Sequence, residues 1–204
     1  MKTYLDDHIY IDHYPKYMKV TDEEFEELWN VEKSIESTPN PMNKKYMIRR
    51  KQCTYGAEYN FAGQKSVNIS QTYDEYPIII KKVLDDVKLR SASDDYNVVH
   101  VNFYPDGNAG LDPHADNEQD MMKNKDIYSY TFLSQEGNPR GFQIYDMNKN
   151  QLKEVMLDNG DLLIMSGGMQ KKFKHGIKKS KSKKFTNLRR INLTVRAWKN
   201  KFMF

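Results

Sequence analysis

Residues 190–196 read Arg190-Ile191-Asn192-Leu193-Thr194-Val195-Arg196, and the fold can be worked out from this stretch. Apolar residues alternate with polar ones, so a strand here places Arg190, Asn192, Thr194 and Arg196 on one face. Two arginines on one strand face need a partner if the face is buried. We therefore expect a pocket for a small dicarboxylate, because a guanidinium pairs with a carboxylate through two hydrogen bonds. The alternative is a face exposed to solvent.

Short strands precede this stretch and are separated by turn residues such as Pro105-Asp106-Gly107 and Asn159-Gly160. The expected strands cover residues 98–104, 127–133, 141–146, 155–157, 162–165 and 190–198. Many short strands of this kind are typical of a closed or sandwich-like β core.

Two helices are expected before the strands. The first begins after Thr21, which forms a capping-box pattern with Glu24, and it carries Phe25, Leu28 and Trp29 on one face. The second is expected from about residue 77 to residue 88, with a proline in its first turn. Helices followed by strands predict an α+β fold.

Length and composition exclude several classes of protein. With 204 residues the chain fits a single domain. No stretch approaches the roughly 18 apolar residues that a membrane span requires, and Met1–Asp7 lacks the apolar core of a secretory signal. Cys53 is the only cysteine, which excludes an internal disulfide and a multi-cysteine zinc site. We expect an intracellular protein in a reducing compartment, without a membrane partner.

The positive charge is concentrated in one block. Residues 171–190 hold ten Lys or Arg and no acidic residue. Because the net charge of the whole chain is +4, the other residues together carry a charge of −6. Such a block favours contact with a polyanion. Within it, residues 178–184 are too charged for a strand and are expected to form a mobile, solvated loop.

His114-Ala115-Asp116 and His175, 61 residues later, form a candidate metal triad. Two imidazoles and one carboxylate suit iron(II), because they leave positions open on the metal. A fully ligated structural zinc site has no such positions. His-x-Asp alone is a weak motif. We interpret His8 and His13 as surface or partly packed residues, and His100 as a strand residue.

These motifs together resemble the AlkB family of iron(II)- and 2-oxoglutarate-dependent dioxygenases, in its nucleic-acid repair branch. The resemblance extends over residues 46–198 and includes Asn102-Phe103-Tyr104, residues 160–165 and residues 173–177. It implies a double-stranded β-helix, or jelly roll, flanked by N-terminal helices. The chain 1–204 is then a single domain, with a helical extension at 1–45, a nucleotide-recognition lid at 46–70 and the β-helix core at 95–198.

The resemblance also implies the roles of individual residues. His114, Asp116 and His175 are the catalytic residues and hold the iron, to which dioxygen and 2-oxoglutarate bind. Arg190 pairs with the distal carboxylate of 2-oxoglutarate. The rest of its pocket is formed by Asn102, Tyr104, Asn192 and Arg196.

The lid and one carboxylate are implied to bind the substrate. Residues 50–56 and 59–61 resemble the recognition lid, which makes Arg50, Gln52, Tyr55, Tyr59 and Phe61 candidate substrate-binding residues. Phe61 and His114 are expected to sandwich the extruded base, although Phe61 also suits a hairpin core. Glu118 extends the motif to His114-x-Asp116-x-Glu118 and can accept a hydrogen bond from an exocyclic amino group; the alternative is a solvated loop residue.

The implied activity is oxidative demethylation of bases of the 1-methyladenine or 3-methylcytosine type in DNA or RNA. It is coupled to conversion of 2-oxoglutarate to succinate, with release of formaldehyde. Some duplex-specific members of the family insert an aromatic wedge into DNA, and the sequence has no convincing counterpart of it before the lid. Single-stranded nucleic acids are therefore the expected partners. The enzyme is expected to be a monomer. The alternatives are a 2-oxoglutarate oxygenase acting on a protein side chain or small molecule, and a nucleic-acid-binding module without catalysis.

Overall fold

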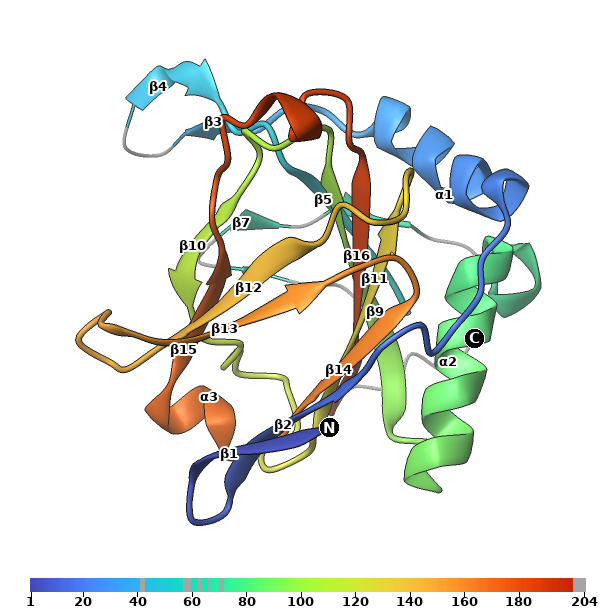
Figure 1. Cartoon of the computed structure of the whole chain (residues 1–204). Coiled ribbons are helices and arrows are strands. Elements are labelled where there is room, and N and C mark those ends of the chain that lie inside the picture. The colour runs from blue at the N-terminus through green and yellow to red at the C-terminus, as the bar shows by residue number, and fades with distance from the viewer. Residues whose placement is uncertain (41–42, 57–59, 62–63, 66, 70–71, 200–204) are drawn as a thin grey trace.

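The computed structural model describes residues 1–40, 43–56, 60–61, 64–65, 67–69 and 72–199, with only the backbone path for 60–61, 64–65 and 67–68. Two β-sheets pack face to face, and two long helices cover the face of the larger sheet that points away from the smaller sheet (Figure 1). This arrangement is the predicted jelly-roll core with flanking helices.

The major sheet has eight strands in the described residues. In spatial order these are β1 (Lys2–Asp6), β2 (Ile9–Tyr14), β14 (Asp161–Met165), β11 (Ile127–Leu133), β16 (Arg190–Ala197), β9 (Tyr96–Tyr104), β5 (Lys51–Tyr55) and β8 (Val67–Asn68). All neighbours are antiparallel except β5 and β8. Strand β16, which carries both Arg190 and Arg196, therefore lies near the centre of the sheet.

The minor sheet faces the major sheet. Its strands in spatial order are β10 (Leu111–His114), β15 (Lys174–Ile177), β12 (Arg140–Tyr145) and β13 (Gln151–Leu157). Two short hairpins lie outside these sheets, and their strands are β3 (Pro39–Asn40), β4 (Asn43–Met47), β6 (Asn60–Phe61) and β7 (Gln64–Lys65). One helical turn, α3 (Met169–Lys172), precedes β15, and two 3-10 turns cover Tyr73–Glu75 and Lys183–Phe185.

Helix α1 (Asp22–Ser34) begins where the sequence predicts. Thr21 Oγ1 accepts a hydrogen bond from the Glu24 amide at 3.2 Å, and Glu24 Oε2 accepts one from the Thr21 amide at 3.0 Å. The capping box is thus confirmed, and it satisfies amides that have no partner within the helix. Phe25, Leu28 and Trp29 are buried on the predicted face.

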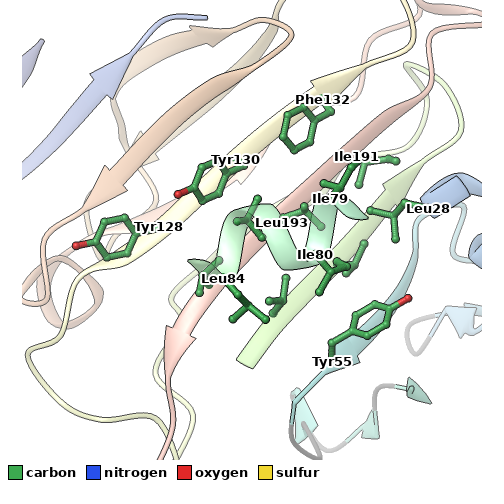
Figure 2. Packing of buried hydrophobic residues seen from close by; sticks show 14 of the residues in the cluster. Leu28, Tyr55, Ile79, Ile80, Leu84, Tyr128, Tyr130, Phe132, Ile191 and Leu193 are labelled. Carbon is green, nitrogen blue, oxygen red and sulfur yellow. The ribbon is translucent and has the colours of Figure 1, made fainter. Parts of the chain in front are cut away.

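Helix α2 (Ile78–Ser91) follows Pro77 and ends at Ala92, which has a left-handed backbone with φ of 49°. It runs one turn further than the sequence predicts. Ile79, Ile80 and Leu84 of this helix lie over Ile191 and Leu193 of β16 (Figure 2). The helix therefore covers the outer face of the major sheet.

The central strands divide their side chains between two environments. On β16, Ile191, Leu193 and Val195 are fully buried in the core beneath α2, whereas the polar residues between them face the minor sheet. This confirms that Arg190, Asn192, Thr194 and Arg196 share one face. Strand alternation thus separates the hydrophobic core from the candidate site.

The N-terminal region differs from the expected helical extension at residues 1–45. Its helix is α1, but β1 and β2 form a hairpin that joins the major sheet through β14, with Ile11 opposite Met165 and Tyr14 opposite Leu162. The hairpin depends on backbone pairing with a strand about 150 residues away, which local sequence patterns do not reveal. Within the described residues, no helix combines the length and apolar character needed to cross a bilayer.

Burial of α2 gives a direct test of the fold. Ile80 is completely buried, whereas Ile78, in the same turn, is 45% exposed. Ile80→Ala should lower the free energy of unfolding by about 3 kcal/mol, because it removes buried methyl groups and leaves a cavity. Ile78→Ala should change it by less than about 0.5 kcal/mol. Urea unfolding of both variants measures the difference, and equal losses would contradict the placement of the helix.

Candidate active site

Two histidines face each other across a pair of strands in the minor sheet. His114 ends β10 and lies opposite His175 of β15. A Cβ on the next residue, Gly176, would lie 2.6 Å from the Leu111 carbonyl oxygen, so only glycine permits this approach of the strands. The pairing therefore brings together two imidazoles that are 61 positions apart in the sequence.

Asp116 completes the triad from the loop after β10. Its amide donates a hydrogen bond to Gln170 Oε1 of α3 at 2.9 Å, and the residue is 1% exposed. The potential ligand atoms of His114, Asp116 and His175 all lie within 4.8 Å of one another. In the described part of the chain this is the cluster able to hold a metal ion, and its two nitrogens and one carboxylate fit iron(II).

Neighbouring groups orient the two rings. His114 Nδ1 lies 3.0 Å from the Asp112 carbonyl oxygen, which leaves Nε2 on the side of Asp116. His175 stacks on Phe142, with ring centroids 5.2 Å apart. Burial, followed by the nearby His114, lowers the pKa of His175 to about 3. The His175 imidazole is therefore neutral at pH 7, as a metal ligand must be.

Polar side chains of four adjacent strands form rows on the inner face of the major sheet. Register places Asn192 opposite both Asn102 and Thr131, with Gln52 beyond Asn102. Asn192 Nδ2 donates to Ser129 Oγ and to the Tyr130 carbonyl, both at 2.9 Å. The rows form the floor of a cavity whose opposite wall carries the triad.

Arg190 lies at one end of this cavity and is 1% exposed. Its Nη2 donates to Thr131 Oγ1 at 3.1 Å, and its guanidinium lies 4.8 Å from the centre of the Tyr104 ring. Burial lowers the pKa of Arg190 to about 10, so the side chain stays charged at pH 7. Its Nε and Nη1 are buried without a hydrogen-bond partner among the described residues. A buried cation with two unused donors fits a carboxylate ligand.

Arg196 lies at the metal end of the cavity. Its guanidinium is 3.0 Å from Asp116 Oδ1 and 3.4 Å from Glu118 Oε1. Burial alone would raise the pKa of Asp116, but Arg196, His114 and His175 outweigh burial and hold that pKa well below its ordinary value. Asp116 is therefore ionised and ready to bind a cation.

Ten of the predicted site residues line this one cavity. They are His114, Asp116, His175, Asn102, Tyr104, Arg190, Asn192, Arg196, Arg50 and Gln52. Glu118 instead lines an adjoining cavity on the other side of Asp116, where it pairs with Arg196. The carboxylate is thus beside the triad, as the motif suggests, but with a cationic partner that the sequence does not reveal.

The predicted lid is partly built into the major sheet. Strand β5 pairs with β9, and Arg50 Nη1 donates to both Gln52 Oε1 and Asn102 Oδ1. The prediction that Tyr55 binds substrate is wrong: it is fully buried against Tyr76 in the core beneath α2. Three residues after Gln52 on one strand, Tyr55 must face the opposite side.

The remaining lid predictions concern residues 59 and 61. Tyr59 lies outside the described residues. Only the backbone of Phe61 is described, and it lies in β6, which pairs with β7 as the predicted hairpin requires. The sandwich of a base between Phe61 and His114 stays a prediction.

His100 lines the cavity, whereas the sequence predicts an ordinary strand residue. It is 4% exposed, and its neighbours on the adjacent strands are Thr54 of β5 and Thr194 of β16. Its pKa is lowered well below the ordinary value, first by burial and then by Arg196 and Arg50. The signal that could have identified it is its position two residues before Asn102 and four before Tyr104, which places all three on one face of the strand.

Comparisons with known proteins agree with this geometry. The model of the 2OG-Fe(II) oxygenase superfamily matches residues 16–196. The solved structure of OsALKBH1 is similar over 96% of this chain and 99% of its own, with a TM-score of 0.59 and 21% sequence identity, which shows a shared fold. No curated protein sequence matches the chain significantly.

The unused donors of Arg190 generate a prediction about ligand binding. Arg190→Met should weaken 2-oxoglutarate binding at least roughly 30-fold, because the diacid loses a buried charged partner. Thermal stability should not fall, since an apolar side chain replaces an incompletely paired buried cation. Isothermal titration with 2-oxoglutarate and manganese(II) measures the change.

The neighbouring residue supplies the control. Arg189 points outward to Glu26, with Nη1 2.8 Å from Oε2. Arg189→Met should change the 2-oxoglutarate affinity less than about twofold, because Arg189 does not line the cavity and its surface ion pair contributes little to stability. Similar affinities for the two variants would exclude Arg190 from the diacid pocket.

Proposed function

Because this chain belongs to the 2OG-Fe(II) oxygenase superfamily, we propose that it oxidatively removes alkyl groups from nucleic-acid bases. An N-methyl base, 2-oxoglutarate and dioxygen would yield the unmethylated base, formaldehyde, succinate and carbon dioxide. Bases of the 1-methyladenine and 3-methylcytosine type are the proposed substrates, in single-stranded DNA or RNA.

One observation carries this proposal beyond the family. The segment that resembles a nucleotide-recognition lid contributes Arg50 and Gln52 to the same cavity as the metal triad. An oxygenase acting on a small molecule has no need of such a segment. The fold shared with OsALKBH1 over nearly the whole chain supports the same choice.

The residues of the cavity have complementary tasks in this proposal. His114, Asp116 and His175 would hold the iron, which supplies the oxidation of 2-oxoglutarate and of the alkyl group by dioxygen. Arg190 would bind the far carboxylate of 2-oxoglutarate, with the Tyr104 ring beneath its guanidinium. Asn102, Asn192 and Arg196 would fix the rest of the diacid.

The protein's further contribution is placement and exclusion of water. Phe142, Leu111, Met165 and Ile177 line the cavity and give it apolar walls. The target base must leave its stack to enter the cavity. A methylated base pairs poorly, so its extrusion costs the least free energy.

Glu118 would influence which base is accepted. Its carboxylate lies beside the triad and is held by Arg196 at 3.4 Å. In that position it would accept a hydrogen bond from an exocyclic amino group and favour a cationic methylated base. Arg196 pairs with both carboxylates, so it would link Glu118, which contacts the base, to Asp116, which binds the metal.

Turnover of methylated oligonucleotides tests the proposed function. Wild-type protein with iron(II), 2-oxoglutarate and ascorbate should demethylate single strands carrying 1-methyladenine or 3-methylcytosine, as measured by mass spectrometry. His175→Ala should reduce this turnover below detection and leave oligonucleotide binding within about twofold, because the change removes a buried metal ligand on which the base is not expected to stack. His8→Ala, at an exposed position, is the control. Turnover of methylated peptides but of no oligonucleotide would refute the proposal.

Base preference tests the role of Glu118. Glu118→Gln keeps the shape of the side chain but removes its charge, so the preference for cationic bases over neutral methylated bases should fall roughly tenfold, equivalent to about 1.4 kcal/mol. Competition between 1-methyladenine and a neutral N-methyl base in one oligonucleotide measures the ratio. Gln119→Glu, which adds a charge at the next position, is the control. An unchanged ratio in Glu118→Gln would remove this residue from base recognition.

A further inference from the structure

A second cavity opens beside the metal triad, and lysines from four separate segments line it. They are Lys123 of the loop before β11, Lys171 of α3, Lys174 of β15 and Lys199 after β16. We propose that this lysine groove binds the phosphodiester backbone of a single-stranded nucleic acid on either side of the target base. The proposal rests on the proposed function only for the identity of that base.

Hydrogen bonds to neutral acceptors hold three of the four ammonium groups of the lysine groove in place. Lys171 Nζ donates to Asn124 Oδ1 at 2.8 Å, Lys174 Nζ to the Met147 carbonyl at 3.3 Å, and Lys199 Nζ to the Gln119 carbonyl at 2.5 Å. Each of these acceptors is neutral. An ammonium group with three donors can bind an anion in addition.

The acidic residues of the groove are outnumbered by cations, because its two carboxylates lie among four lysines and beside the Arg196 guanidinium. Asp116 and Glu118 are the carboxylates among its described lining residues, and Arg196 lies within 3.0 and 3.4 Å of them. The outer part of the groove is therefore cationic, with Lys123 and Lys171 exposed at its surface. Such a groove attracts a polyanion and follows its backbone.

Position connects the groove to the proposed reaction. Asp116 lines both the groove and the triad cavity, so the two adjoin at a metal ligand. A base that enters the triad cavity from this side would carry its neighbouring phosphates past the lysines. Met121 and Met147 add apolar surface on which sugars or flanking bases can pack.

The basic loop at 178–184 is a separate surface. The Ser180 amide donates to the Gly107 carbonyl at 2.7 Å, the Gly107 amide donates to the Phe185 carbonyl at 2.8 Å, and Phe185 packs with Leu188 and Leu133. The loop is thus anchored to the core, unlike the mobile loop that the sequence suggests. Its lysines line neither of the two cavities. The fold therefore separates Lys171 and Lys174 of the basic block, which line the groove, from the lysines of this loop.

This division provides a matched experiment. Lys123→Glu/Lys171→Glu reverses two charges in the lysine groove, and Lys181→Glu/Lys183→Glu reverses two exposed charges on the loop. Both variants change the net charge equally, so any difference in oligonucleotide affinity between them must come from the position of the charges. Binding of a fluorescent single-stranded oligonucleotide, with and without 1-methyladenine, is measured by anisotropy over a range of salt concentrations.

The groove variant should bind either oligonucleotide at least roughly tenfold more weakly. Its slope of log affinity against log salt should be shallower by about 1.4, because each contact with a single-strand phosphate contributes about 0.7. The loop variant should lie within about threefold of wild type. Lys123→Gln/Lys171→Gln should show the same change in slope, and thermal unfolding verifies that all variants are folded.

The outcomes separate the lysine groove from the proposed function. Three results would overturn the proposal that the lysine groove binds phosphodiesters. They are an equal loss of binding in the groove and loop variants, an unchanged salt slope in the groove variant, and tighter binding of an acidic peptide than of the oligonucleotide. Groove-dependent binding without demethylation of any base would support the groove and refute the proposed function. Demethylation with undiminished oligonucleotide affinity in the groove variant would refute the groove alone.

Discussion

The pairing of β10 with β15 is the constraint on which the candidate site depends. It places His114 opposite His175, and Gly176 lets the two strands approach closely enough for both rings to reach one ion. Asp116 joins them from the following loop, held by Gln170. Without the minor sheet these groups would be far apart, so the site forms only when the jelly roll closes.

The major sheet supports this site by dividing its residues between two faces. The outer face of β9 and β16 is apolar and packs beneath α1 and α2, whereas the inner face is polar and lines the cavity (Figures 1 and 2). Buried charges such as Arg190 and Arg196 oppose folding unless they are paired. Apolar burial on the outer face offsets that opposition, so the same strands provide both stability and chemistry.

Charge is arranged along one path through the molecule. Arg190 lies at the inner end of the triad cavity, Arg196 lies beside Asp116 and Glu118, and the lysine groove begins on the other side of Asp116. Positive groups in and beside low-dielectric clefts raise the local concentration of anions. A small diacid and a phosphodiester chain would both be attracted, one to the interior and one to the entrance.

The sequence by itself determined the features that are encoded within short windows. The capping box of Thr21 and Glu24, the strands around residues 98, 127 and 190, and the shared face of Arg190 to Arg196 all follow from local spacing. The resemblance, carried by the strand at 190–196 together with His114, Asp116 and His175, identified the triad as a metal site. Only the tertiary structure decided the pairing of Arg196 with Glu118, the core position of Tyr55, the N-terminal hairpin and the division of the basic block. The physical reason is that strand pairing between distant segments uses backbone hydrogen bonds, which nearly every residue can make and which therefore leave little trace in the sequence.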